Sequence, residues 1–217
     1  MESRLHYHTV TTLLEEILKD LMLASEFDAF RLVGGTSLSL QIGHRLSIDI
    51  DLFTDAPYGS VDFDSIHHYL INKYQYVDSY HFETIGFGKI YFVGNSKNDS
   101  VKLDLYYTDP FIRDILFEDG IRLASIEEII AMKVDVISRG GRKKDFWDLH
   151  ELMNDFTIKS MIDLHLERYP FSHDPELIKA NFIEFDEADN EFDPNCFKHK
   201  YWELIKLDFL DFVHSAK

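Results

Sequence analysis

The run from Gly34 to Phe53, GGTSLSLQIGHRLSIDIDLF, constrains the fold of this chain more than any other segment. Asp49 and Asp51 lie in a β-branched, apolar stretch that is typical of a strand, and residues two apart in a strand point to the same face. Two such carboxylates repel each other unless a cation lies beside them. Mg²⁺ prefers carboxylate oxygens, completed by substrate phosphates and water. The pair therefore predicts a site for Mg²⁺, or for Mn²⁺ in its place.

The front half of the same run predicts a place for the phosphates. Gly34 and Gly35 follow a short apolar segment and precede a stretch, residues 37–41, that looks helical. A Gly-Gly turn that opens a helix leaves free backbone N–H groups, and the helix dipole favours an anion there. Thr36 adds a hydroxyl. A Gly-Gly or an Asp-x-Asp alone is a weak signal, but together at this spacing they predict a phosphate cradle beside a metal site.

A third carboxylate, Asp104, lies in the apparent strand 101–107, VKLDLYY. The alternation places Val101, Leu103 and Leu105 on one face and Lys102, Asp104 and Tyr106 on the other. If this strand lies near the Asp49/Asp51 strand, Asp104 completes a three-carboxylate site. Two cations held by three carboxylates can activate an attacking oxygen and stabilise a leaving pyrophosphate. A solvent-facing aspartate on a sheet is the alternative interpretation.

A third segment, residues 133–149, combines cations with carboxylates. Ser125 and Glu128 form a capping box, and Lys133 falls within the apolar stripe of the helix that follows. An inward lysine must extend out of the core or meet an anion, and a triphosphate is such an anion. Asp145 and Asp148 share a face of the next helix, where they either pair with Lys133 or an arginine or accept a proton from an acceptor. A basic cluster comprises Arg139, Arg142, Lys143 and Lys144.

The helices and strands expected from the sequence predict an α+β fold, with a mixed sheet and helices in residues 1–121 and a helical region in residues 122–217. The chain has 217 residues, of which 45% are apolar, which is enough for one sizeable core with a helical appendage. The acidic stretch 184–193 is interpreted as a solvated loop. The expected helices are 11–27, 62–74, 125–139, 142–153, 158–168, 175–182 and 198–213, and the expected strands include 82–93 and 101–107.

The net charge of the chain limits the kinds of macromolecule that it can bind. The net charge is −17, so a nucleic acid would be held by a local basic patch, and an acidic surface could alternatively serve a basic protein. No stretch approaches the roughly 18 apolar residues of a membrane span. The N-terminus has no apolar signal segment, and the single cysteine, Cys196, excludes an intramolecular disulfide. We expect a cytoplasmic protein that does not enter a membrane.

These motifs together resemble the AbiEii/AbiGii-type nucleotidyltransferase toxins of type IV toxin–antitoxin systems, within the DNA polymerase beta-like nucleotidyltransferase superfamily. The matching pieces are Gly34–Thr36, His44–Phe53, Lys102–Leu105, Lys133–Arg139, Lys144-Asp145 and Asp148-Leu149. The resemblance implies that the glycine turn and the Asp-x-Asp pair hold Mg-NTP. It also implies nucleotide contacts from Arg45, Lys133 and Arg139, and a catalytic role for Asp145.

The sequence thus predicts a Mg²⁺-dependent enzyme that transfers a nucleoside monophosphate from an NTP to an acceptor hydroxyl. Asp49, Asp51 and Asp104 hold the metal and carry catalysis, together with Lys133 and Asp145. The resemblance implies that the acceptor is tRNA and that a separately encoded antitoxin restrains the toxin. Two alternatives stay open. One is nucleotidyl transfer to a protein side chain or a small molecule such as an aminoglycoside, and the other is a non-catalytic nucleotide-binding module.

Overall fold

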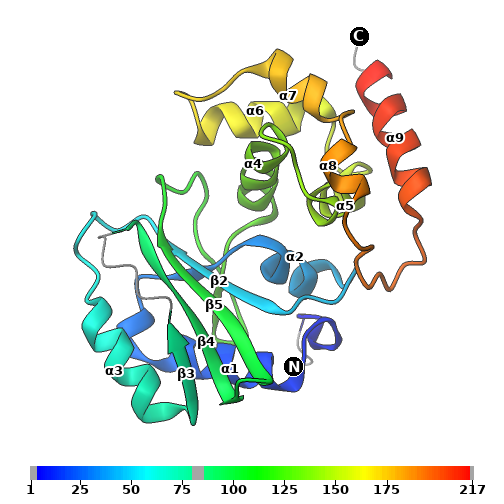
Figure 1. The fold of residues 1–217 in the computed structure, drawn as a ribbon. Coiled ribbons are helices and arrows are strands. Elements are labelled where there is room, and N and C mark those ends of the chain that lie inside the picture. The colour runs from blue at the N-terminus through cyan, green and yellow to red at the C-terminus, as the bar shows by residue number, and fades with distance from the viewer. Residues whose placement is uncertain (1–3, 80–85, 216–217) are drawn as a thin grey trace. The chain divides into compact units, whose positions relative to one another are not determined.

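The computed structural model describes residues 4–79 and 86–215 of the chain (Figure 1). Its internal contacts divide the chain into two compact units. The first unit comprises Met1–Gly43 and Ser47–Ala124, and the second comprises His44–Leu46 and Ser125–Lys217. The division after Ala124 lies close to the boundary at residue 121 that the sequence suggests, but the short segment His44–Leu46 groups with the C-terminal helices.

The first unit is built on a mixed sheet whose strand order is β3-β4-β5-β2-β1-β7-β6. β2 pairs in parallel with β5 and antiparallel with β1, so the strand with the Asp-x-Asp motif lies inside the sheet. The α+β class predicted from the sequence is confirmed. The strands are β1 (Arg31–Leu32), β2 (Asp49–Thr54), β3 (Tyr76–Ser79), β4 (Gly88–Ser96), β5 (Asp99–Tyr107), β6 (Leu116–Glu118) and β7 (Ile121–Leu123).

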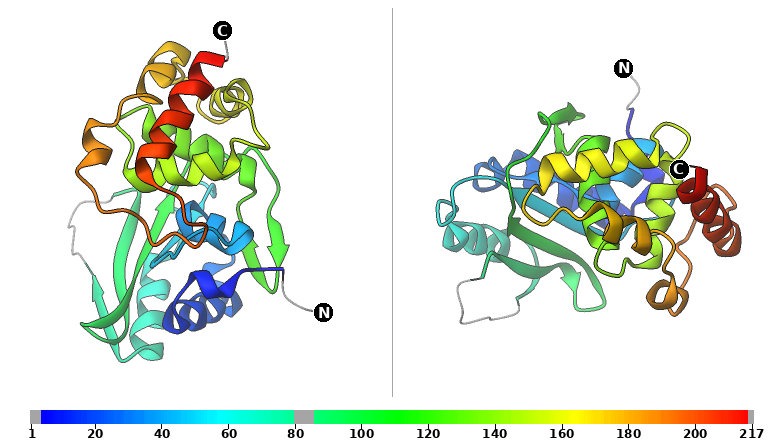
Figure 2. Two further views of the ribbon diagram at one scale, coloured as in Figure 1. Left: turned by 90° about the vertical axis from the view of Figure 1, so that its right-hand side faces the viewer. Right: turned by 90° about the horizontal axis from the view of Figure 1, so that it is seen from above.

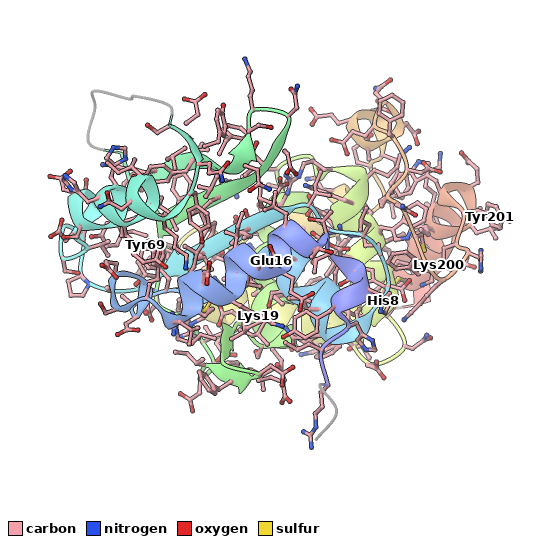
Figure 3. The ribbon with its side chains drawn as sticks, turned by 90° about the horizontal axis from the view of Figure 1, so that it is seen from below. His8, Glu16, Lys19, Tyr69, Lys200 and Tyr201 are labelled. Carbon is pink, nitrogen blue, oxygen red and sulfur yellow. The ribbon has the colours of Figure 1, made fainter. Side chains whose placement is uncertain are left out.

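Two helices, α1 (Thr12–Leu23) and α3 (Phe63–Lys73), cover the apolar face of this sheet. Thr11 begins α1 by accepting a hydrogen bond from the Leu14 amide, and the inner face of α1 is fully buried. Glu16 and Lys19 lie on the outer face of α1, which Figure 3 shows from below. The inward residues of the sheet are Ile50, Leu52, Leu103 and Leu105. Because strand residues alternate, Asp49, Asp51 and Asp104 lie on the opposite face.

The remaining local structure departs from the predicted ranges in a few places. α2 (Gly34–Ile42) begins at the first glycine, three residues before the predicted helix. The helix predicted for residues 11–27 is interrupted at Ala24, whose backbone is extended, before a short 3-10 turn at Ser25–Phe27. Residues 82–85 of the predicted strand 82–93 lie outside the described residues, and β4 continues to Ser96. Strands β3, β6 and β7 are too short to show a period in the sequence.

Helices joined by loops make up most of the described part of the second unit, as Figures 1 and 2 show. Ser125 accepts a hydrogen bond from the Glu128 amide at 3.3 Å, so the predicted cap begins α4. An aromatic cluster forms the core, in which the Trp147 and Trp202 rings stack with centroids 6.4 Å apart. The helices are α4 (Ile126–Ile137), α5 (Lys143–Leu152), α6 (Ile158–Arg168), α7 (Pro175–Asn181), α8 (Asp186–Asp189) and α9 (Trp202–Ser215).

The acidic stretch 184–193 differs from the solvated loop that its composition suggests. It contains the short helix α8, and its last part binds a lysine. The Lys143 ammonium donates to the Glu191 carbonyl at 2.6 Å and to the Asp193 carboxylate at 3.0 Å. The charge of this stretch is therefore partly neutralised inside the second unit.

Candidate active site

The three strand aspartates share one face of the sheet in the first unit. β2 and β5 are in register, so Asp51 lies directly opposite Asp104, and Asp49 lies opposite Lys102. Both strands alternate between buried apolar residues and half-buried polar ones over this stretch. Paired residues of neighbouring strands project to the same side. The fold therefore presents three carboxylates and one ammonium together on the face that α1 and α3 leave uncovered.

Lys102 is the cation of this group. Its ammonium lies 2.5 Å from Asp104 Oδ2, and its side chain is about one-third exposed. Burial alone would lower the pKa of Lys102, but the bond to Asp104 and the charges of Asp104, Asp51 and Asp49 raise it. Asp104 Oδ1, by contrast, is buried and has no hydrogen-bond partner among the described residues. A carboxylate oxygen in that condition can accept a ligand without breaking an existing bond.

Gly34 brings the N-terminus of α2 against the Asp51 carboxylate. Its φ of +67° lies in the left-handed region, and a Cβ at this position would stand 2.6 Å from Asp51 Oδ2. Only glycine allows both the conformation and the approach. The Val33 amide donates to the Asp51 carbonyl at 2.9 Å, which holds the turn to β2. The open amides of the first turn of α2 thus begin beside the acidic pair, where an anion is favoured.

Thr36 serves the scaffold of this turn. Its hydroxyl is buried, donates to the Asp49 carbonyl and lies 2.7 Å from the Ser47 hydroxyl. These bonds attach α2 to the start of β2. Because they occupy the hydroxyl, Thr36 would contact a phosphate through its backbone N–H. The side chain predicted to join the cradle instead fixes the cradle relative to the carboxylates.

The donor set of this face fits a divalent cation. Carboxylate oxygens are the ligands that Mg²⁺ prefers, and Asp104 Oδ1 is available to such an ion. In the described part of the chain, no three His, Cys, Asp or Glu side chains are gathered tightly enough to form a ready-made metal centre. The ammonium of Lys102 already neutralises part of the charge that a cation would neutralise.

The other predicted site residues lie in the second unit, and all of them except Arg139 belong to a buried ion-pair network centred on Asp148. Arg45 donates to Asp148 through Nε at 2.6 Å and through a terminal nitrogen at 2.7 Å, in the bidentate geometry that arginine favours. Lys133 lies 2.6 Å from the same carboxylate and His44 lies 2.7 Å from it. Burial would raise the pKa of Asp148, but the Arg45 and Lys133 cations hold it well below the ordinary value.

Asp145 extends the network toward the surface. Its carboxylate accepts from Lys133 at 2.9 Å and from the half-exposed Arg142 at 2.8 Å. Burial opposes ionisation of Asp145, yet the two cations lower its pKa. Lys133 is the reciprocal case, because burial would lower its pKa and the charges of Asp145 and Asp148 raise it. The Lys133 ammonium is therefore shared by two carboxylates, as the salt-bridge interpretation expects.

His44 is fully buried in this network. Burial lowers its pKa below the ordinary value, although the Asp148 carboxylate opposes that change. Since Nε2 faces Asp148, that nitrogen carries the proton, and Nδ1 is left buried without a hydrogen-bond partner in the described structure. His44 and Arg45 lie shortly before β2 in the chain, and both bond to Asp148.

The predicted basic cluster is smaller than its sequence suggests. Lys143 is buried and bonded to Glu191 and Asp193, so its ammonium does not belong to a surface patch. Arg139 is exposed and bonds to Asp135 one helical turn earlier. Arg142 is half exposed and bonds to Asp145.

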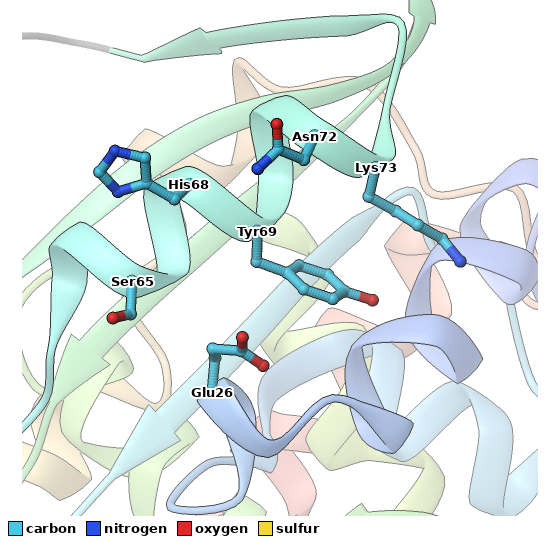
Figure 4. Close-up of a pocket in the computed structure, with 6 residues that line it drawn as sticks. All are labelled: Glu26, Ser65, His68, Tyr69, Asn72 and Lys73. Atoms are coloured by element: carbon cyan, nitrogen blue, oxygen red, sulfur yellow. The ribbon is translucent and has the colours of Figure 1, made fainter.

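A separate hollow of about 520 Å³ lies on α3 and the turn before β1 (Figure 4). Tyr69 and Lys73 reach from α3 toward Asp20. The Tyr69 hydroxyl lies 3.5 Å from the Asp20 carbonyl oxygen, and the Lys73 ammonium lies 3.1 Å from the Asp20 carboxylate. Because α3 covers the apolar face of the sheet, this hollow is not on the face that bears the carboxylates. Its lining comprises Glu26, Ser65, His68, Tyr69, Asn72 and Lys73.

The class of protein follows from how β1, α2, β2 and β5 are combined. A glycine turn opens a helix against an Asp-x-Asp strand, and a neighbouring parallel strand supplies the third acid at the matching level. This is a nucleotidyltransferase fold. The structure resembles that of a candidate nucleotidyltransferase from H. pylori, with a TM-score of 0.58, 21% identity, and coverage of 93% of this chain and 90% of that one. It also resembles MenT4, a nucleotidyltransferase toxin of Mycobacterium tuberculosis H37Rv, with a TM-score of 0.54, 13% identity, and coverage of 93% and 83%.

The sequence identifies the family to which the chain belongs. Residues 16–216 match the family model described as nucleotidyl transferase AbiEii toxin of type IV toxin–antitoxin systems, so the chain belongs to this family. An uncharacterized protein of Aquifex aeolicus (strain VF5) is 28% identical over 191 residues, which cover 83% of this chain and 84% of that protein. The chain is therefore a toxin-type nucleotidyltransferase, and its family implies an NTP substrate and an antitoxin partner. No helix within residues 4–79 and 86–215 is both long and apolar enough to cross a bilayer.

Proposed function

We propose that the protein transfers a nucleoside monophosphate from an NTP to an acceptor hydroxyl at the carboxylate face of the first unit, with Mg²⁺ or Mn²⁺ as the cation. The observation that carries the proposal is the pairing of Asp51 with Asp104 beside Gly34. Asp49, Asp51 and Asp104 hold the cation, which neutralises phosphate charge when bound. The backbone amides of Gly34, Gly35 and Thr36 receive the phosphates.

The reaction requires positioning and charge stabilisation more than covalent chemistry from the protein. The acceptor oxygen forms a bond to the α-phosphorus, the bond from that phosphorus to the bridging oxygen breaks, and pyrophosphate leaves. The hydroxyl proton passes to water as this bond forms, and the Asp104 carboxylate assists its removal. The roles implied by resemblance for Arg45, Lys133, Arg139 and Asp145 remain proposals. For Lys133 and Asp145 the competing interpretation is the ion-pair network that they form.

The family likeness favours tRNA as the acceptor, with a separately encoded antitoxin as the restraining partner and the cytoplasm as the location. A protein side chain or a small molecule is a second candidate acceptor. The net charge of −17 and the burial of Lys143 favour it, because both reduce the attraction for a polyanion.

The test is incubation with each labelled NTP, Mg²⁺ or Mn²⁺, and either total tRNA or a cell lysate. We expect label on one acceptor class with the wild type and none with Asp51→Asn, whose melting temperature should be unchanged or raised because carboxylate repulsion is relieved. Asp78→Asn is the matched control, since Asp78 is an exposed carboxylate on the edge strand β3. Equal transfer by wild type and Asp51→Asn would refute the metal-dependent mechanism.

A further inference from the structure

An aromatic pair continues the carboxylate face beyond the acidic residues. Phe53 follows Asp51 by two residues on β2, Tyr106 follows Asp104 by two on β5, and the two aromatic residues are paired in register. Their ring centroids are 5.9 Å apart in an edge-to-face arrangement. Both rings are half-buried, and they lie on the opposite side of the sheet from Leu52 and Leu105, which enter the core. The pair is therefore not part of the hydrophobic core of this unit.

The distance from this pair to the carboxylates matches the dimensions of a nucleotide. Two residues of a strand span about 7 Å, and because β2 and β5 are parallel both rings are displaced in the same direction. One pentose separates the phosphate of a nucleotide from its base by a length of the same order. A ligand whose phosphates lie at Gly34 and Asp51 can thus place a base at the rings.

The backbone of β4 braces the Tyr106 ring. Gly88 is the register partner of Tyr106, and a Cβ at Gly88 would stand 2.6 Å from Tyr106 Cδ1 and 2.0 Å from the Leu105 carbonyl oxygen. The absence of a side chain at Gly88 lets the ring lie against the strand, with Phe53 on its other side. A ring fixed in this way loses little conformational freedom when a ligand stacks on it.

The same row of residues ends in a cation. Arg31 on β1 is the register partner of Phe53, and its guanidinium lies 3.7 Å from the centroid of the Phe111 ring. The face thus offers carboxylates beside a helix N-terminus and, two residues further along β2 and β5, a row of two aromatic rings and an arginine. An aromatic ring next to an anion site suits a nucleobase better than an aliphatic ligand, because every base has a π-face that stacks on such a ring.

We propose that Phe53 and Tyr106 form the surface on which an unpaired nucleobase stacks during the reaction. This inference rests on the proposed nucleotidyl transfer and assigns the base of that substrate to a definite place. The base belongs either to the incoming NTP or to the terminal nucleotide of an acceptor strand, and the two sources share the same stacking chemistry.

The test compares ligands with and without a base. Calorimetric titrations with the four NTPs and with inorganic tripolyphosphate are made on the wild type and on Phe53→Leu and Tyr106→Ala. We expect about 5- to 100-fold weaker binding of at least one NTP in each variant, with tripolyphosphate binding unchanged, since one base–aromatic stack has about that effect. Tyr106→Phe, which keeps the ring, should restore NTP affinity. Phe92→Ala is the matched control, because Phe92 lies on the same face opposite Lys102.

The other outcomes separate the two sources and the two proposals. If NTP affinity is unchanged but a short single-stranded RNA binds the ring variants 5- to 100-fold more weakly, the base is that of the acceptor strand. If NTPs and RNA bind all variants as they bind the wild type, the stacking proposal is wrong while nucleotidyl transfer stands. A loss confined to Phe92→Ala places the base at the other end of the face and also overturns the stacking proposal. If neither tripolyphosphate nor any NTP binds the wild type, the nucleotide site itself is refuted.

Discussion

Lys133→Met separates the two roles that the sequence allows for this lysine. In the structure its ammonium lies 2.9 Å from Asp145 and 2.6 Å from Asp148, and its side chain is 6% exposed. Removing one partner of a buried ion pair costs about 3–5 kcal/mol when the remaining charge is left uncompensated. Here each carboxylate keeps another cation, Arg142 for Asp145 and the bidentate Arg45 for Asp148. We therefore expect a smaller loss, ~2–4 kcal/mol of unfolding free energy.

The assay is thermal and urea unfolding, followed by NTP titration of the same preparations. A loss of that size lowers the melting temperature by roughly 5–15 °C in a chain of this length. Lys133→Met combined with Asp145→Asn should lose less than the sum of the two single changes, because the pair is removed together. Lys159→Met is the control, since Lys159 forms only an exposed pair one turn away, worth at most about 0.5 kcal/mol.

The opposite pattern would refute this reasoning. An unchanged melting temperature with NTP binding weakened at least tenfold would assign the Lys133 ammonium to the triphosphate. A fall in stability without a change in NTP affinity would assign it to the ion-pair network alone.

Three further predictions concern Gly34, Lys102 and His44. Gly34→Ala should cost about 1–3 kcal/mol of stability and weaken tripolyphosphate binding. Gly59→Ala is the control, because Gly59 has a similar positive φ but nothing within 4 Å of an added Cβ, and it should leave binding intact. Equal effects of the two substitutions on tripolyphosphate binding would exclude the Asp51 contact as the cause. Lys102→Gln should bind Mn²⁺ on the order of tenfold more tightly by calorimetry, and unchanged affinity would mean that Lys102 does not face the cation. Burial lowers the pKa of His44, so the unfolded state binds the extra proton and stability is lost as pH falls below about 6.5. His44→Gln should flatten that loss by up to about 1.4 kcal/mol per pH unit in urea unfolding, and an identical pH profile would contradict it.

The side of the sheet on which each strand residue lies could be predicted from the sequence. In β2 and β5 the apolar residues alternate with polar ones, so the common face of Asp49 and Asp51 follows from spacing alone. The strand order could not be predicted, because β2 and β5 are separated in the chain by α3, β3 and β4. Nothing in the local pattern states that Asp104, rather than another residue, lies opposite Asp51.

The ion pairs of the second unit show a second limit. Helical spacing places Lys133, Asp145 and Asp148 on inward faces, which the sequence suggested, but the main partner of Asp148 is Arg45, 103 residues earlier. Lys143 looks like its basic neighbours in the sequence, yet it is buried because Glu191 and Asp193 reach it from the acidic stretch. Whether a charged residue is exposed depends on such distant partners, which no local pattern reveals. Lys102 could be placed on the acidic face by alternation, although its pairing with Asp104 needed the structure.

The two sets of carboxylates differ in what they can still bind, and this difference bears on where the proposed chemistry takes place. Asp148 accepts from His44, Arg45 and Lys133 on both oxygens, and its pKa is held well below the ordinary value, so it neither takes up a proton near neutral pH nor offers a free oxygen. Asp104 has one oxygen on Lys102 and one without a partner in the described structure. A group that must receive a proton or a cation during each turnover needs such spare capacity. We therefore expect the helix carboxylates to stabilise the second unit and the strand carboxylates to take part in the proposed nucleotidyl transfer.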